Sequence, residues 1–218
     1  RLDKNDPNYE HQMMEALWVH QWMNVVDADL LQRMLKSPEP RARAAAGRVL
    51  CYWRDRVPNA LALFRALAED EHPRARLEAV RAASFYRSHE AADMALLALK
   101  RPTDYYLDYT LTETLRQLEP YWRGAISQGL PIARDNPAGI DRLIASLTTA
   151  ELERVPRTEG VLSALLTRPG VAEASRELVL RGLIDAGAEG KRIAPPERAI
   201  GRDRLAHDPF AQGRGVGL

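Results

Sequence analysis

One phrase occurs twice in the chain. Residues 37–50 read SPEPRARAAAGRVL and residues 70–83 read DEHPRARLEAVRAA, an offset of 33 residues. Pro73-Arg74-Ala75-Arg76 lies over Pro40-Arg41-Ala42-Arg43 in this alignment. Similar segments at a fixed period are typical of repeat proteins, in which each unit packs mainly against its neighbours.

The pattern around the two copies is helical. Apolar residues recur at spacings of three and four, as in Ala60, Leu61, Phe64, Leu67 and Ala68. Several prolines precede such runs, and Thr148 with Glu151 fits a capping box. Ser88 is the expected cap of the run after it, and we find no convincing strand alternation. We predict about ten helices, ending near residue 187.

The repeat period indicates how these helices are organised. A first copy is expected in residues 10–21 and a fourth, degenerate copy from Pro102 onward. A period of 30–33 residues suits one pair of helices per repeat, near the short end for HEAT-type units. The predicted fold is therefore all-α: a HEAT-like α-solenoid of antiparallel pairs, in which Ala75, Ala79 and Ala83 sit in a sandwiched helix.

The composition sets further limits. The 218 residues carry a net charge of +1 and a single cysteine, Cys51. This excludes an internal disulfide framework, a multi-cysteine metal site and the C-x-x-C-H attachment of a c-type haem. No apolar stretch is long enough to span a bilayer and no signal peptide is recognisable. Because the chain begins at Arg1, we expect a fragment or a processed product.

The chain divides into two predicted parts. Residues 1–187 form the helical repeat domain, and residues 188–218 form a Gly/Pro-rich tail with little periodicity. The sequence contains neither a G-x-S-x-G motif nor a phosphate-binding glycine loop, so it offers no catalytic motif and whether the chain is an enzyme stays open.

Two arginines occupy matching places in the repeated phrase. Arg43 and Arg76 lie beside the apolar face of their helices, whereas Arg74, Glu78 and Arg81 share another face that we expect to be a solvated stripe. An arginine repeated beside the core can bind helix ends or an acid of the next repeat. We expect Arg43 and Arg76 to form a ladder between repeats, with ligand binding as the alternative.

Residues 102–122 form the densest aromatic and acidic patch. Asp104 and Asp108 are one helical turn apart, as are Tyr105 and Tyr109, and Trp122 closes the segment. Paired carboxylates can bind a cation or act as acid and base, but acids in a first helical turn also favour the helix dipole. We expect these acids and tyrosines to serve mainly the structure, through the helix dipole and through packing against the next helix. We also predict that any interaction surface of the chain lies here, because aromatic residues are enriched at interface hot spots.

Two other patterns suggest chemistry more weakly. His11, Met14, Trp18 and Trp22 share one helical face, which allows a haem or metal site but is typical of a core stripe. Arginines also make the middle of the chain locally basic: Arg41, Arg48, Arg54, Arg56, Arg74 and Arg81. A DNA-binding groove like that of HEAT-like alkylpurine DNA glycosylases is the alternative function, although nucleic acid is the less favoured partner because intervening acids interrupt the patch.

Four strings resemble one protein family in particular. They are HQMMEALWVHQ (11–21), SPEPRARAAAGRVLCYWRDR (37–56), DEHPRARLEAVRAASF (70–85) and PTDYYLDYTLTETLRQLEPYW (102–122). Together they look like the helical-repeat region of PVC-type haem-binding proteins, also described as putative membrane-bound dehydrogenases of planctomycetes and relatives. The string LTTAELERVPRTEGVLSALLTRPGV (147–171) resembles the same region.

The resemblance implies a role between other domains. In that family a sugar-dehydrogenase-like β-propeller precedes the helical repeats and a cytochrome c domain follows them. It implies that this chain is a non-catalytic spacer in a larger exported protein, periplasmic or at the cell surface, with protein domains of the same or an associated polypeptide as partners. Haem c, and a quinone cofactor, would belong to those neighbouring domains, because this chain carries neither set of ligands.

Overall fold

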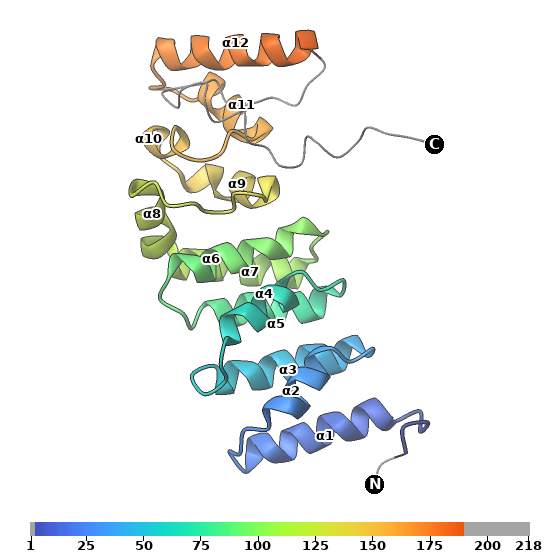
Figure 1. The fold of residues 1–218 in the computed structure, drawn as a ribbon. Helices are drawn as coiled ribbons and strands as arrows, with labels where there is room; N and C mark the ends of the chain where they lie inside the picture. Colours follow the sequence, from blue (N-terminus) through green and yellow to red (C-terminus); the bar gives the residue numbers. More distant parts are fainter. Residues whose placement is uncertain (1–2, 190–218) are drawn as a thin grey trace, which may run out of the picture.

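The computed structural model of the chain describes residues 3–189, whose regular elements are all helices (Figure 1). The α-helices of this part are α1 Tyr9–Trp22, α2 Ala28–Leu35, α3 Pro40–Trp53, α4 Ala60–Ala68, α5 Pro73–Ala83, α6 His89–Leu96, α7 Tyr105–Gln117, α8 Glu119–Ser127, α9 Pro137–Leu143, α10 Thr149–Leu152, α11 Glu159–Thr167 and α12 Glu173–Glu189. Two short 3₁₀ helices are η1 Leu97–Lys100 and η2 Ile144–Ser146. The all-α prediction is confirmed, with twelve α-helices in these residues instead of about ten, because the segment from α9 to α11 is divided into short pieces.

The helices form two parallel rows. In one row α3 packs against α1 and α5, and α5 packs in turn against α7. In the other row α4 packs against α6, and α6 against α8. The rows are joined within the pairs α2/α3, α4/α5 and α6/α7, and the elements advance in chain order from α1 at one end of the stack to α12 at the other (Figure 1). This progression is that of a helical solenoid.

Local signals in the sequence set the helix boundaries. Pro40 and Pro73 are the first residues of α3 and α5, where the missing N–H of proline costs nothing. The predicted capping box is confirmed, since the Thr148 hydroxyl accepts from the Glu151 N–H and the Glu151 carboxylate accepts from the Thr148 N–H. The predicted cap at Ser88 is confirmed as well, because its hydroxyl accepts from the Ala91 N–H.

Small residues allow the rows to approach closely. Ala75, Ala79 and Ala83 have no exposed surface, as expected of a helix packed on several sides. Gly47 lies where α3 meets α4: a Cβ atom added there would stand 2.5 Å from the Leu67 Cδ2 atom. Since real Cβ atoms do not come that close to a neighbour, a larger residue at position 47 would push the Leu67 side chain aside.

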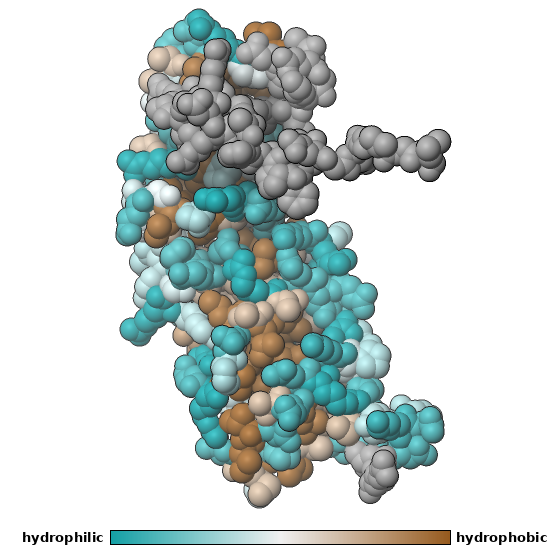
Figure 2. All heavy atoms as spheres, in the orientation of Figure 1, coloured by the Kyte–Doolittle hydropathy of each residue, from teal (hydrophilic) through white to brown (hydrophobic). Residues whose placement is uncertain are grey.

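The predicted core stripe of α1 is wrong. Met14 and Leu17 are buried, but Trp18 is 45% exposed and Trp22 is 88% exposed. The reason is the position of α1 at the end of the described stack, where it packs mainly against α2 and α3. Within residues 3–189 its other faces are not covered by a closely packed helix, and Figure 2 shows apolar surface over this end of the stack.

The C-terminal boundary is described only in part. Helix α12 continues to Glu189, two residues past the predicted end of the repeat domain. The remainder of the predicted tail, residues 190–218, lies outside the described residues, so that prediction stays open. Among the helices described, none combines the length and the apolar character that crossing a membrane requires.

Candidate functional site

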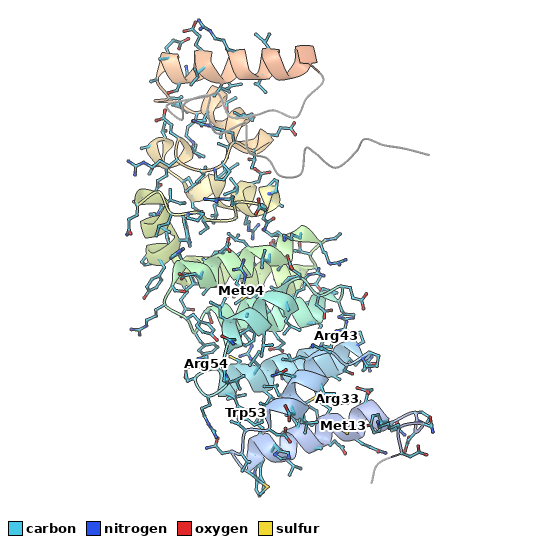
Figure 3. All side chains as sticks on the ribbon, viewed as in Figure 1. Met13, Arg33, Arg43, Trp53, Arg54 and Met94 are labelled. Atoms are coloured by element: carbon cyan, nitrogen blue, oxygen red, sulfur yellow. The ribbon has the colours of Figure 1, made fainter. Side chains whose placement is uncertain are left out.

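Arg43, at the start of α3, joins two successive repeats (Figure 3). Its Nε and Nη2 atoms donate to the two carboxylate oxygens of Asp70, over 2.7 and 2.9 Å. Its Nη1 atom donates to the backbone oxygen of Ser37 over 2.9 Å. Ser37 precedes α3 and Asp70 precedes α5, so one guanidinium holds two consecutive turns together. The hydrogen bond with Asp70 raises the pKa of Arg43, despite burial, which acts in the opposite direction.

Arg76 makes the corresponding contacts one repeat further along. Its Nη1 atom donates to the backbone oxygens of Asp70 and Glu71, over 2.9 and 3.0 Å, and its Nη2 atom donates to the backbone oxygen of Pro102. Pro102 lies between η1 and α7, in the next turn of the stack. Arg76 is 1% exposed and binds carbonyl groups instead of a carboxylate. Burial therefore lowers its pKa.

Asp70 links the two arginines. Burial alone would raise the pKa of Asp70, but the hydrogen bonds from Arg43 and from the His72 N–H, 2.8 Å away, outweigh it and lower the pKa. The folded state thus favours the ionised carboxylate, while the unfolded chain has the ordinary pKa of aspartate. The stabilisation is present above that ordinary pKa and is lost as the pH falls through the lower folded-state value.

This gives a prediction for Asp70→Asn. At pH 7 the variant should lose about 2 kcal/mol of unfolding free energy, the usual contribution of a hydrogen bond to a charged group. The difference from the unsubstituted chain should shrink as the pH falls below about 4, because the unfolded chain then takes up a proton at Asp70 that the folded carboxylate binds only at lower pH. Urea denaturation at pH 7, 4 and 3 measures it. A difference that is the same at all three pH values would show that the Asp70 charge is not what stabilises the turn.

The sequence did not predict the role of Glu78 in joining two repeats. The expectation that Glu78 lies on a solvated stripe is wrong. It is 2% exposed and accepts hydrogen bonds from the Nε and Nη2 atoms of Arg48 on α3 and from Nε of Arg81, the last over 3.0 Å. The hydrogen bond and the charge of Glu78 raise the pKa of Arg48. Glu78 is buried because its position faces the seam between α5 and α3, where two arginines cover one carboxylate. The i, i+3 spacing to Arg81 was the available signal.

Arginines tie the later turns in a similar way. Arg123 on α8 donates to the Glu151 carboxylate over 2.6 Å, and Arg142 on α9 donates to the Thr112 hydroxyl on α7 over 2.6 Å. Arg168 donates to the backbone oxygens of Ile144 and Leu147. Sequence reasoning did not find these contacts, because the helices that carry them do not repeat the phrase of α3 and α5.

The predicted interaction surface lies on α7. Tyr105, Tyr106 and Tyr109 are 77%, 70% and 60% exposed, and the first two rings meet edge to face with centroids 5.5 Å apart. Asp104 caps the helix by accepting from the Leu107 N–H over 2.8 Å. Asp108 forms an ion pair of 3.1 Å with Arg142 of α9. The two carboxylates therefore serve a helix cap and an inter-helix contact.

Trp122 does not belong to this surface. It is 2% exposed, and its indole N–H donates to the backbone oxygen of Leu115 over 2.9 Å. Trp122 lies on α8, after the chain has turned away from α7, so its ring packs into the core of the stack. Its inclusion in the interaction surface is corrected on this ground.

Two further features of residues 3–189 bear on chemistry: the groups that could hold a metal ion and the thiol of Cys51. No group of three His, Cys, Asp or Glu side chains is placed to hold a metal ion there. Cys51 is buried in α3, and this burial raises the pKa of its thiol. A raised pKa keeps the sulfur protonated and poorly nucleophilic.

The comparisons with known proteins address the repeat region. Residues 28–116 match the family model of HEAT repeats. The chain contains a HEAT-like repeat region. The matched residues run from the start of α2 almost to the end of α7, so the HEAT-like region comprises the pairs α2/α3, α4/α5 and α6/α7 and includes Arg43, Arg76 and Glu78. Neither the curated proteins nor the solved structures searched contain a match to the chain.

Proposed function

We propose that this chain is a non-catalytic scaffold that docks protein domains through the exposed face of α7, formed by Asp104, Tyr105, Asp108 and Tyr109. The observation that carries the proposal is the exposure of Tyr105 and Tyr109, at 77% and 60%, on a helix inside the HEAT-like region. HEAT repeats are helical scaffolds, and exposed tyrosines bury much area at low entropy cost when a partner covers them.

The helix beneath these tyrosines is held firmly. Leu107 and Leu111 have no exposed surface, and the Thr114 hydroxyl donates to the backbone oxygen of Val80 on α5 over 3.3 Å. The ion pair of Asp108 with Arg142 fixes the same helix to α9. A partner would therefore meet a preorganised surface and would have few backbone freedoms to immobilise on binding.

The finer role that we propose is that of a spacer. In this proposal the chain separates a dehydrogenase-like propeller from a cytochrome c domain in an exported protein, at the periplasmic or cell-surface side, with haem c and a quinone cofactor held by those domains. The four strings quoted above support it, and a rigid stack of helix pairs is suited to setting a distance. The first test is the gene that encodes the chain: a downstream C-x-x-C-H codon run is expected, and a gene without one would contradict the spacer role.

Binding should depend on the tyrosines. We expect Tyr105→Ser combined with Tyr109→Ser to weaken the association with the neighbouring domains of the parent protein about tenfold or more, because hot-spot aromatics carry most of an interface's energy. The domains are produced separately and titrated against the chain by calorimetry. Tyr52→Ser, at an exposed tyrosine of α3, is the matched control and should bind normally. If the double variant bound the neighbouring domains as tightly as the unsubstituted chain does, α7 would not be the docking surface.

The competing function is nucleic-acid binding by the arginines of α3 and α5. Two of these guanidiniums, those of Arg48 and Arg81, are already paired with Glu78, and that of Arg54, just after α3, is paired with Asp55. Because of this pairing, less positive charge on α3 and α5 is available to bind the phosphates of a nucleic acid. Affinity for duplex DNA that falls steeply between 50 and 200 mM salt would favour this competitor over the scaffold.

A further inference from the structure

Helix α1 carries an apolar stripe that is only partly covered. His11, Met14, Trp18 and Trp22 recur at spacings of three and four, which places them on one face of the helix. Met14 is buried, whereas Trp18 is 45% exposed and Trp22 is 88% exposed. The end helix of a helical solenoid normally has a polar outer face. At this end of the described stack (Figure 1), two tryptophan rings meet water instead.

A groove runs beside this stripe, between α1 and α3. Its volume is about 560 Å³, and its apolar lining includes Met14, Trp18, Ala42 and Ala45. The position equivalent to Ala45 in α5, 33 residues later, is Glu78, which lies in the seam between α5 and α3. Because alanine is smaller than glutamate, the seam between α1 and α3 stays open.

The carboxylates that line the groove already have partners within the chain. The Glu10 carboxylate accepts from the guanidinium of Arg33 on α2, and the Glu39 carboxylate accepts from the backbone N–H of Arg41 over 3.2 Å. The remaining ionisable side chains of the lining are those of Arg41 and His11, so neither sign of charge prevails. An apolar floor with balanced charges at its edges fits an uncharged, apolar side chain.

The chain itself carries such a side chain in a segment without charge. Residues 16–26 contain no Asp, Glu, Lys or Arg, and Trp22 lies near their middle. In a two-fold contact a residue near the axis meets its own copy, so an uncharged segment can pair with itself without repulsion. The turn after α1 is held by a hydrogen bond from the Val25 N–H to the His20 backbone oxygen over 2.9 Å. The Trp22 backbone is therefore already in place before a partner arrives.

The spacing along α1 fits an antiparallel pair of helices. Met14 of the groove and Trp22 are eight residues apart, about 12 Å along the helix, and Trp18 lies halfway between them. If two α1 helices lie antiparallel about a two-fold axis at Trp18, Trp22 of each copy lies opposite Met14 of the other. Each chain then contributes one ring and offers one groove, which is the reciprocity of an isologous contact.

We propose that two copies of this chain pair through α1, with Trp22 of each copy seated in the α1/α3 groove of the other. Covering Trp18 and Trp22 removes about 200–330 Å² of exposed surface per chain, about a third of what a standard interface buries on each partner. The dimer is therefore weak, with a dissociation constant of about 10–100 µM. The pairing goes beyond the scaffold function, since α7 takes no part in it.

The oligomeric state of the full chain is the first test. Sedimentation equilibrium over a range of concentrations should show a mass that rises from one chain to two and then stops rising. The tryptophan emission should shift to shorter wavelength as the dimer forms, because Trp18 and Trp22 leave water while Trp53 and Trp122 are buried throughout. A mass that continues to rise beyond two chains would contradict a closed two-fold contact.

Two variants examine the ring and the groove separately. Trp22→Ser removes the ring, and Ala45→Glu places a carboxylate in the groove; each should weaken self-association about tenfold or more. Circular dichroism of Trp22→Ser should match that of the unsubstituted chain, since the ring is exposed. As a control, Tyr105→Ser with Tyr109→Ser removes two exposed rings of α7 and should leave the dimer unchanged.

A mixture of the two variants tests whether the ring sits in the groove. The Trp22→Ser chain keeps an intact groove and the Ala45→Glu chain keeps an intact ring. A mixed pair therefore retains one of the two ring-in-groove contacts, whereas each variant by itself retains neither. We expect the equimolar mixture to form more dimer than either variant alone at the same total concentration.

Three results would overturn the proposal. The first is a chain that stays monomeric at about 1 mM, tenfold above the weakest dissociation constant expected. The second is a Trp22→Ser chain that dimerises as tightly as the unsubstituted chain, and the third is a mixture that associates no better than its components. None of these results bears on the α7 surface, whose own test uses the neighbouring domains, so the two failures are distinguishable.

Discussion

Ala79→Asp should remove at least about 4 kcal/mol from the free energy of unfolding, the largest effect expected of a single substitution in this chain. Ala79 has no exposed surface, and α5 packs against α3 on one side and α7 on the other. The substitution places a carboxylate without a partner between these helices. It either stays ionised at a high desolvation cost or takes up a proton, and both outcomes destabilise the folded state. Urea denaturation followed by circular dichroism measures the loss.

The control for this prediction is the same change at an exposed alanine. Ala62 lies in the first turn of α4 and is exposed, so Ala62→Asp should change the unfolding free energy by less than about 0.5 kcal/mol. A carboxylate there also interacts favourably with the helix dipole. If Ala79→Asp were as mild as Ala62→Asp, α5 would not be the sandwiched helix that the stack requires.

Arg76→Met should lower the free energy of unfolding by about 2–3 kcal/mol. Methionine matches much of the volume of the arginine side chain but leaves three backbone oxygens, those of Asp70, Glu71 and Pro102, without the guanidinium donor. An unsatisfied buried acceptor costs about 1–3 kcal/mol. Removing a buried charge recovers part of its desolvation penalty, which is why the expected loss is less than the sum over three acceptors.

Arg74→Met is the matched control, two residues earlier in the same helix. Arg74 is exposed, so its replacement should change stability by less than about 0.5 kcal/mol. Thermal and urea denaturation of the two variants can be compared directly, since both remove one positive charge from α5. An Arg76→Met variant as stable as Arg74→Met would mean that the carbonyl contacts do not hold successive turns together.

The repeated phrase made much of the fold predictable. Helices α3 and α5 both begin with a proline and both carry alanines at the spacing of a buried face. The repeat period, the helical conformation and the buried face of each helix could therefore be predicted from the local sequence. The same offset placed Arg43 and Arg76 at equivalent positions, and the structure gives both a set of contacts to the turns before and after them.

Features that depend on a neighbouring helix were harder to predict. Glu78 has the sequence context of a surface residue, and its burial depends on Arg48, 30 residues earlier in the chain. Trp122 lies in an aromatic segment, but its exposure depends on where α8 turns relative to α7. Trp18 and Trp22 follow a helical apolar spacing, and only the position of α1 at the end of the described stack leaves them exposed.

The distances between helices along the stack test most directly whether the helices form an open solenoid. Spin labels on cysteines introduced at the exposed residue His11 of α1, paired in turn with Arg74 of α5, Tyr106 of α7 and Glu177 of α12, report them by pulsed electron paramagnetic resonance, because the buried Cys51 should not react. With 8–10 Å between neighbouring helices of a row, we expect about 20 Å to α5, about 30 Å to α7 and a still longer distance to α12. A separation from α1 to α12 no longer than that from α1 to α5 would mean that the helices close into a bundle, and would contradict the solenoid and the functions proposed for it.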